Sequence, residues 1–252
     1  MKIGVADYGM NVWYGGCYDT EERLRELKSI GYQGIERLEA VSEADAVNKA
    51  AMFRKNGMDF SMVRGPNVET TIRWTAALGK SYVWAQVTGK DFHTFCRQVN
   101  EQVRIAGKYG IFVGLHNHLG TLIETHEQLV SFLDHCPECG LVFDTGHHAA
   151  AGGDVMAIIN DYHKRLVALH LKDWNDTTKT NPAGNPKWYD CGYFTGLGKG
   201  NIGQDNKTAL KTAIAQGYDG WVFVEHDTHK QDPLIDLKQS RDYIGNIIGE
   251  TK

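Results

Sequence analysis

The chain has 252 residues, of which 42% are hydrophobic and 23% are charged, and its formal net charge is −4. This length suits one large α/β domain or two small domains, and the negative charge excludes the basic surface that binds a nucleic-acid backbone. No apolar run approaches the ~18 residues of a membrane span, and the N-terminus lacks the pattern of a signal peptide, so we expect a cytoplasmic protein that binds no membrane.

Eight short apolar runs predict β-strands. They are rich in β-branched and aromatic residues, and Gly, Asp or Asn residues flank them, as is typical of strands. In chain order the predicted strands span residues 2–8, 34–39, 59–64, 81–87, 111–118, 140–145, 166–172 and 220–226.

Amphipathic stretches between these runs predict helices. Leu24, Leu27 and Ile30 lie at helical spacing before Gly31, and Thr125 with Gln128 forms the pattern of a capping box. The predicted helices span residues 20–32, 92–110, 125–136, 153–164, 205–217 and 234–249, and the helical pattern is weakest over 66–80.

This alternation predicts an α/β protein whose residues 1–252 form a single (β/α)8 TIM barrel domain. An open doubly wound sheet is the alternative, but no GxGxxG motif follows the first strand. The irregular stretch 174–204 is about thirty residues long, well above the usual loop length, and it follows a strand. We therefore expect it to be a long active-site loop, covering either its own site or that of a neighbouring chain.

The five cysteines are an odd number, and we expect them to be reduced. Cys136 and Cys139 form a CPEC stretch, which is typical of a redox pair or of half a zinc site. No second CxxC exists in the chain, and the stretch lies between a predicted helix and a predicted strand. We therefore interpret it as a turn with two ordinary thiols.

Residues that can bind a metal ion lie at the ends of the last four predicted strands. The strand ends read LHNH at 115–118, FDTGHH at 143–148, LHLKD at 169–173 and VEHD at 224–227. In a barrel these ends open on one rim, and imidazoles with carboxylates bind divalent Mn, Co, Zn or Fe. Because residues i and i+2 of a strand face the same way, His116 can bind metal while His118 reaches the substrate.

Other side chains near the strand ends are candidates for catalysis or substrate binding. Lys172 shares a strand face with His170, so it can point at an oxyanion, although it can equally be a solvated charge at the rim. Aromatic walls with a few polar groups suit a sugar or a cyclitol, although the same residues can be ordinary barrel packing. The candidates for this role are Trp13, Tyr14, Arg64, Trp84 and Gln86.

The second half of the chain resembles a known superfamily. The matching stretches are 116–121, 143–154, 168–173, 192–203 and 217–227. They resemble the xylose isomerase-like TIM barrel superfamily, described broadly as sugar phosphate isomerases/epimerases, and look most like inosose dehydratase. The resemblance covers residues 110–227 well and the first hundred residues only in outline.

The resemblance implies one divalent metal ion per chain, with manganese favoured over cobalt, zinc, iron(II) and magnesium. The implied metal ligands are His116, Asp144, His170 and Glu225. It also implies that His147 contacts the substrate or a metal-bound water. The implied catalytic residues are Glu225, His118, His147 and Lys172.

One position departs from part of the superfamily. Keto-sugar epimerases carry a glutamate where His116 stands, and this glutamate is one of their two opposed bases; Glu124 is a candidate replacement. A histidine there favours elimination. We therefore expect a metal-dependent lyase or dehydratase that acts on a keto-cyclitol or 3-keto sugar through an enediolate. Glu225 or a histidine would take the proton, and His118 or His147 would protonate the departing oxygen.

Three other functions remain as alternatives. A keto-sugar isomerase or epimerase would use the same enediolate, and a non-catalytic sugar-binding subunit would keep the barrel without turnover. A DNA-repair endonuclease shares the fold, but it would need three zinc ions and a basic groove that this acidic chain lacks. A homo-oligomer is an expectation from the fold alone.

Overall fold

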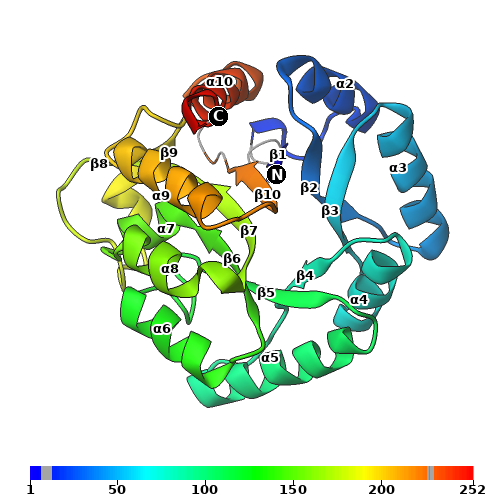
Figure 1. Cartoon of the computed structure of the whole chain (residues 1–252), viewed down its shortest axis with the longest axis horizontal. Coiled ribbons are helices and arrows are strands. Elements are labelled where there is room, and N and C mark those ends of the chain that lie inside the picture. The colour runs from blue at the N-terminus through cyan, green and yellow to red at the C-terminus, as the bar shows by residue number, and fades with distance from the viewer. Residues whose placement is uncertain (7–12, 226, 228–229, 252) are drawn as a thin grey trace.

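Eight parallel strands form a nearly closed barrel in the computed structural model, which describes residues 1–6, 13–225, 227 and 230–251 (Figure 1). The barrel strands are β1 (Lys2–Val5), β2 (Gly34–Glu39), β3 (Asp59–Arg64), β4 (Tyr82–Trp84), β5 (Phe112–His116), β6 (Gly140–Asp144), β7 (Leu166–Leu171) and β10 (Trp221–Val224). Residues 7, 8 and 226 of the predicted strands lie outside the described residues. The prediction of a TIM barrel is confirmed, and the open doubly wound sheet is not formed.

Helices surround the strands (Figure 1). They are α2 (Thr20–Ile30), α3 (Glu43–Lys55), α4 (Val68–Ala77), α5 (Phe92–Gly107), α6 (His126–His135), α7 (Thr145–Ala150), α8 (Val155–Tyr162), α9 (Gly203–Ala215) and α10 (Pro233–Thr251). Helices α3 and α7 were missed by the sequence analysis. Helix α3 has a weak apolar period, although Ser42 caps it by accepting a hydrogen bond from the Asp45 amide. None of the described helices has the length and apolar character needed to cross a membrane.

The strand order explains where the strand ends meet. Backbone hydrogen bonds join the strands in the order β3-β2-β1-β10-β7-β6-β5-β4, and each of these pairs is parallel. Asp144 of β6 lies opposite His170 of β7, and Val224 of β10 lies opposite Leu171. This register brings the polar residues after β5, β6, β7 and β10 to one rim.

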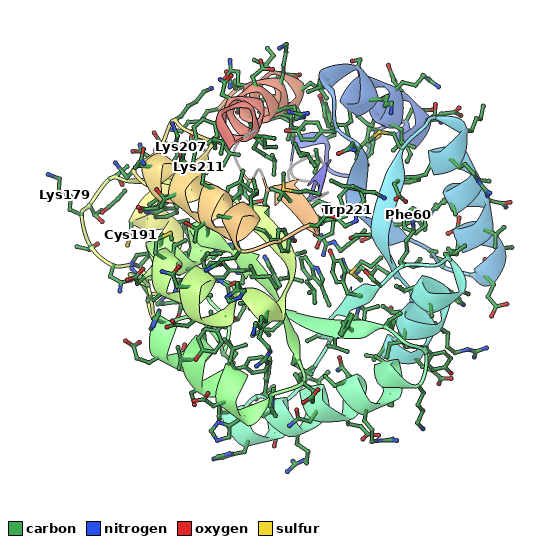
Figure 2. The ribbon with its side chains drawn as sticks, viewed as in Figure 1. Phe60, Lys179, Cys191, Lys207, Lys211 and Trp221 are labelled. Atoms are coloured by element: carbon green, nitrogen blue, oxygen red, sulfur yellow. The ribbon has the colours of Figure 1, made fainter. Side chains whose placement is uncertain are left out.

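Apolar side chains fill the space between the strands and helices. Leu24 and Leu27 of α2 are fully buried, as their helical spacing predicts, and Gly31 ends this helix at φ 103°. Only glycine adopts this left-handed conformation at low cost. Many charged side chains lie on the outside: Figure 2 shows Lys207 and Lys211 on α9, and Lys179 at the periphery.

The segment 174–204, expected to be irregular, contains regular structure. Strand β8 (Asp173–Asp176) pairs antiparallel with β9 (Gly192–Thr195). The buried carboxylate of Asp173 accepts hydrogen bonds from the backbone amides of Gly198, Gly200 and Ile202. A Cβ at position 200 would lie 2.4 Å from Asp173, so this glycine-rich loop wraps around a carboxylate of its own chain.

The five cysteines carry no disulfide bond, and Cys136, Cys139 and Cys96 are buried. Burial raises the pKa of the Cys136 thiol well above its usual value and that of Cys139 to about 12. The Arg165 guanidinium donates to the carbonyl oxygens of both CPEC cysteines, which fixes the stretch as a turn. These observations agree with two ordinary structural thiols.

We expect iodoacetamide at neutral pH to label the exposed Cys17 in the native protein and to spare Cys136 and Cys139, because alkylation needs an accessible thiolate. Peptide mass spectrometry after a short exposure measures this directly. Unfolding in urea should make all five cysteines reactive. Labelling of Cys136 at the rate of Cys17 in the native protein would contradict the structural assignment.

Candidate active site

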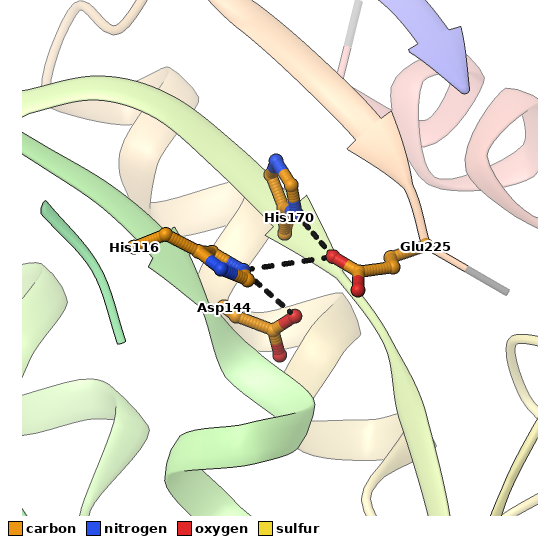
Figure 3. A group of neighbouring side chains, drawn as sticks. All are labelled: His116, Asp144, His170 and Glu225. Carbon is orange, nitrogen blue, oxygen red and sulfur yellow. Dashed lines mark hydrogen bonds and ion pairs between the residues drawn. The ribbon is translucent and has the colours of Figure 1, made fainter. Parts of the chain in front are cut away.

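Four side chains from consecutive strands of the sheet meet at the rim (Figure 3). Each offers one ligand atom, and these four atoms all lie within 4.8 Å of one another; the residues are His116, Asp144, His170 and Glu225. The Glu225 Oε2 lies 2.5 Å from Nδ1 of His170 and 3.6 Å from Nε2 of His116. The predicted ligand set is thus brought together in one small volume.

Three polar atoms in this group are buried without a hydrogen-bond partner: Nε2 of His116, Oδ2 of Asp144 and Nε2 of His170. The first two lie 3.5 Å apart. A buried polar atom without a partner is costly, and a cation between a ring nitrogen and a carboxylate oxygen would satisfy both atoms. The two imidazoles and two carboxylates therefore fit a divalent metal ion in number, type and position.

Local structure fixes the orientation of Asp144. This residue caps α7, because its Oδ1 accepts a hydrogen bond of 2.7 Å from the His147 amide, and its Oδ2 is left to face His116. The Asn117 side chain bonds to both the backbone amide and the backbone carbonyl of Asp144. The turn that begins α7 thus holds the carboxylate in place.

The electrostatics of the group favour added positive charge. Burial lowers the pKa of His116 and His170, but the neighbouring carboxylates outweigh burial and raise it, to about 10 for His170. Burial favours the protonated form of Glu225, yet Lys172 and the imidazoles hold its pKa well below the usual value. The Glu225 carboxylate therefore stays anionic and attracts cations.

Glu36 of β2 is a residue that the sequence analysis missed. Its side chain is fully buried, and its Oε1 lies 3.1 Å from Nε2 of His170. The same oxygen accepts hydrogen bonds from Trp84 Nε1 (2.7 Å) and the Tyr82 hydroxyl (3.0 Å). Since Nδ1 of His170 faces Glu225, the ring is held between two carboxylates. The sequence could have indicated this residue, because a glutamate within a predicted buried strand (34–39) needs a polar partner.

Replacing Glu36 by glutamine is expected to weaken metal affinity by about 10–100-fold, because the group that orients a ligand histidine and raises its basicity is lost. Metal titration by calorimetry measures this change. Glu39→Gln, at the exposed end of the same strand, is the matched control and should bind metal like the native protein. Equal affinities for the two variants would show that Glu36 does not support His170.

His118 and His147 lie beside the four residues. Their ring centroids are 3.6 Å apart, and those of His116 and His118 are 5.7 Å apart. Nδ1 of His118 lies 2.6 Å from the Leu119 carbonyl oxygen, so the neutral ring donates there and leaves Nε2 unprotonated. Burial lowers the pKa of His118 to about 4. This ring is therefore uncharged at neutral pH, with its Nε2 unprotonated.

Lys172 lies deeper than the sequence analysis expected. Its side chain is fully buried, and its Nζ lies 2.9 Å from both Glu225 Oε1 and His147 Nε2. The same ammonium forms an ion pair with Asp227. Asp227 was not among the predicted site residues, although the VEHD stretch carried it as an acidic residue at a strand end.

A cavity of about 680 Å3 opens beside His116 and has the size of a small-molecule site. Of the predicted substrate-binding residues, Arg64, Trp84 and Gln86 line it. The Trp84 ring stacks on His116 with centroids 4.4 Å apart, which joins the cavity to the four-residue group.

The other two predicted substrate-binding residues have different surroundings. The Tyr14 hydroxyl lies 3.4 Å from Asp232, and the Arg23 guanidinium lies over the Tyr14 ring, so Tyr14 packs beside α2. Trp13 is half-buried.

Glu124 has a structural partner for each oxygen. Its Oε1 accepts from the Gly120 amide (2.9 Å) and its Oε2 from the Gly184 amide (3.0 Å). Glu124 thus ties the segment 174–204 to the turn after β5, with a backbone amide bonded to each of its two oxygens. The Phe194 ring of this segment lies 4.8 Å from the His147 ring, so the segment packs beside these residues within its own chain.

Comparisons with known proteins agree with the barrel fold. A family model described as "Xylose isomerase-like TIM barrel" matches residues 24–247. An inosose dehydratase from Lactiplantibacillus plantarum is 32% identical over 165 residues, which cover 62% of this chain and 54% of the relative. The chain thus spans about half the length of the first curated relatives it matches.

Two further matches extend over the whole chain. An inosose dehydratase from Mesomycoplasma hyopneumoniae (strain J) is 29% identical over 297 residues, covering 98% of this chain and 96% of the relative. The crystal structure of IOLI protein with a binding zinc atom superimposes with a TM-score of 0.74 at 18% identity, covering 100% of this chain and 99% of that one. At that identity the second match shows the barrel fold.

Proposed function

This chain belongs to the xylose isomerase-like TIM barrel family, and from that premise we propose that it is a divalent-metal-dependent lyase of the dehydratase type. We propose a keto-cyclitol or a 3-keto sugar as its substrate. The observation that carries the proposal is the pair of unsatisfied atoms, His116 Nε2 and Asp144 Oδ2, beside a histidine with a free Nε2. The curated relatives named inosose dehydratase support the same reaction class.

The proposed ligands are the four residues of Figure 3, and manganese is the ion to test first, since a mixed set of imidazoles and carboxylates suits it. When bound, such an ion supplies Lewis acidity that makes the proton beside a ketone easier to remove. The protein itself supplies the orientation of the ligands, through the α7 cap on Asp144 and the contact between Glu36 and His170.

We assign the proton transfer to His118. Its Nε2 takes the proton from the carbon beside the ketone, while its Nδ1–H stays bonded to the Leu119 carbonyl, which stabilises the resulting imidazolium. The same Nε2–H then donates to the departing hydroxyl, so that the substrate loses one water molecule. His147 is less suited to be the acid, because Lys172 already donates to its Nε2.

The cavity beside His116 is the proposed place of the substrate ring. The indole of Trp84 forms an apolar wall next to the metal ligands, and Arg64 and Gln86 offer hydrogen-bond donors to hydroxyl groups. Apolar walls with few polar groups are typical of pockets for sugar-sized molecules.

Proton NMR in deuterated water with the manganese-loaded protein tests this function. We expect an inosose or a 3-keto glucoside to lose water or its departing group, and we expect a chelator to stop the reaction. Deuterium in an otherwise intact skeleton would instead support an isomerase or epimerase. If the metal-loaded protein changes no keto-sugar, the result would instead support a non-catalytic sugar-binding subunit.

A further inference from the structure

We propose that the ammonium of Lys172 occupies the place that a second divalent ion would otherwise take, and thereby limits this site to one metal ion. The inference rests on the metal centre of the proposed function and not on its substrate. It gives Lys172 a role in setting the number of ions.

A second group of potential metal ligands lies next to the first. His147, Glu225 and Asp227 each offer one ligand atom, and these atoms lie within 4.8 Å of one another. Glu225 belongs to both groups. Two neighbouring ligand groups with a shared carboxylate are the usual arrangement for two ions about 3.5–4 Å apart.

Lys172 is bound to every member of this second group. Its Nζ lies 2.9 Å from Glu225 Oε1 and 2.9 Å from His147 Nε2, and it forms an ion pair with Asp227. An ammonium has three N–H donors, and here each has one acceptor. No donor is left for a substrate oxyanion, so the group that the sequence suggested as an oxyanion ligand acts as a fixed cation.

The packing around Lys172 holds the ammonium in this position. The side chain is fully buried, and its Nζ lies 4.2 Å from the centroid of the Phe194 ring, over its face. Its stem passes Gly146, where an added Cβ would lie only 2.6 Å from the Lys172 Cβ. Glycine at this position therefore makes room for the stem beneath α7.

Because of the position of Lys172, the two carboxylate oxygens of Glu225 have different partners. Oε1 accepts from Lys172, whereas Oε2 faces His170 and His116. Only Oε2 is therefore directed at the first metal position. Lys172 thus acts as a positioning residue that makes Glu225 a ligand through one oxygen and denies the other oxygen to a second ion.

Manganese titration of the native protein and of Lys172→Met tests the inference, with metal counted by elemental analysis and the ions examined by electron paramagnetic resonance. We expect one ion with an uncoupled spectrum in the native protein. In Lys172→Met we expect two ions per chain with an exchange-coupled spectrum. Adding Asp227→Asn to Lys172→Met should return the count to one.

Two outcomes would overturn the inference: two coupled ions in the native protein, or a single ion in a folded Lys172→Met at saturating manganese. If Lys172→Met does not fold, Lys172→Gln is the second variant, and we expect the same two ions per chain for it. Two coupled ions in the native protein would overturn the inference whatever either variant shows. A native protein with one ion that dehydrates no keto-sugar would overturn the proposed function and leave this inference standing.

Discussion

Asp144→Asn is expected to lower the affinity for a divalent ion by more than about 100-fold, which is beyond the loss expected when a residue supporting a ligand is changed. The substitution removes the negative charge of the Oδ2 atom, which faces His116 and has no hydrogen-bond partner. It also leaves only one of the two carboxylates that would balance the charge of a divalent ion. The asparagine oxygen can still accept from the His147 amide, so the cap of α7 is kept. Elemental analysis of the purified protein measures the loss.

Asp154→Asn is the matched control for this variant. Asp154 caps α8 in the same way, with its Oδ1 accepting a hydrogen bond of 3.0 Å from the Ala157 amide, and it is not one of the four proposed ligands. This control should keep about one ion per chain and native turnover. A full complement of metal in Asp144→Asn would remove the proposed metal centre and the proposed lyase together.

His118→Asn is expected to lower kcat by about 10²–10⁴-fold, the usual contribution of a general acid–base, while the metal content stays native. An asparagine amide can replace the Nδ1–H that bonds to the Leu119 carbonyl, but it offers no group that accepts a proton at neutral pH. The decisive measurement is kcat, together with the metal content, on the substrate identified by NMR.

His135→Asn controls for a general effect of losing a histidine. Nδ1 of His135 also lies close to a backbone oxygen, 2.8 Å from the Ser131 carbonyl, but this residue ends α6 outside the site. It should keep native kcat. If His118→Asn also keeps native kcat, another group moves the proton, and Glu225 becomes the first candidate.

The sequence alone was sufficient to predict the barrel and the four neighbouring candidate ligands. Each strand is an apolar run whose alternation needs no distant residue, and parallel strands in a barrel must open their carboxyl ends on the same rim. Once the runs ending at His116, Asp144 and His170 were identified, their proximity followed from topology. The resemblance to a known superfamily then selected these residues from the other polar ones nearby.

Helices and strands whose apolar residues show little periodicity were harder to predict from the sequence. Helix α3 has few buried residues, so its periodicity is weak, and its start is marked by the Ser42 cap and the acidic residues of its first turn. Strands β8 and β9 pair with each other and not with the barrel, and they lie in a segment rich in glycine and polar residues. The Asp173 carboxylate accepts hydrogen bonds from the backbone amides of the glycine-rich loop that follows β9.

The partners of buried charges were decided only by the tertiary structure. Glu36 reaches His170 from 134 positions earlier in the chain, and Lys172 forms ion pairs with Glu225 and Asp227, which follow β10. Sequence spacing records which side of a strand a residue faces, but not which charge lies opposite it across the barrel. Only the closure of the barrel brings such side chains within a few ångströms of one another. A buried charge without a partner is costly, so the side chains that meet there form ion pairs and hydrogen bonds.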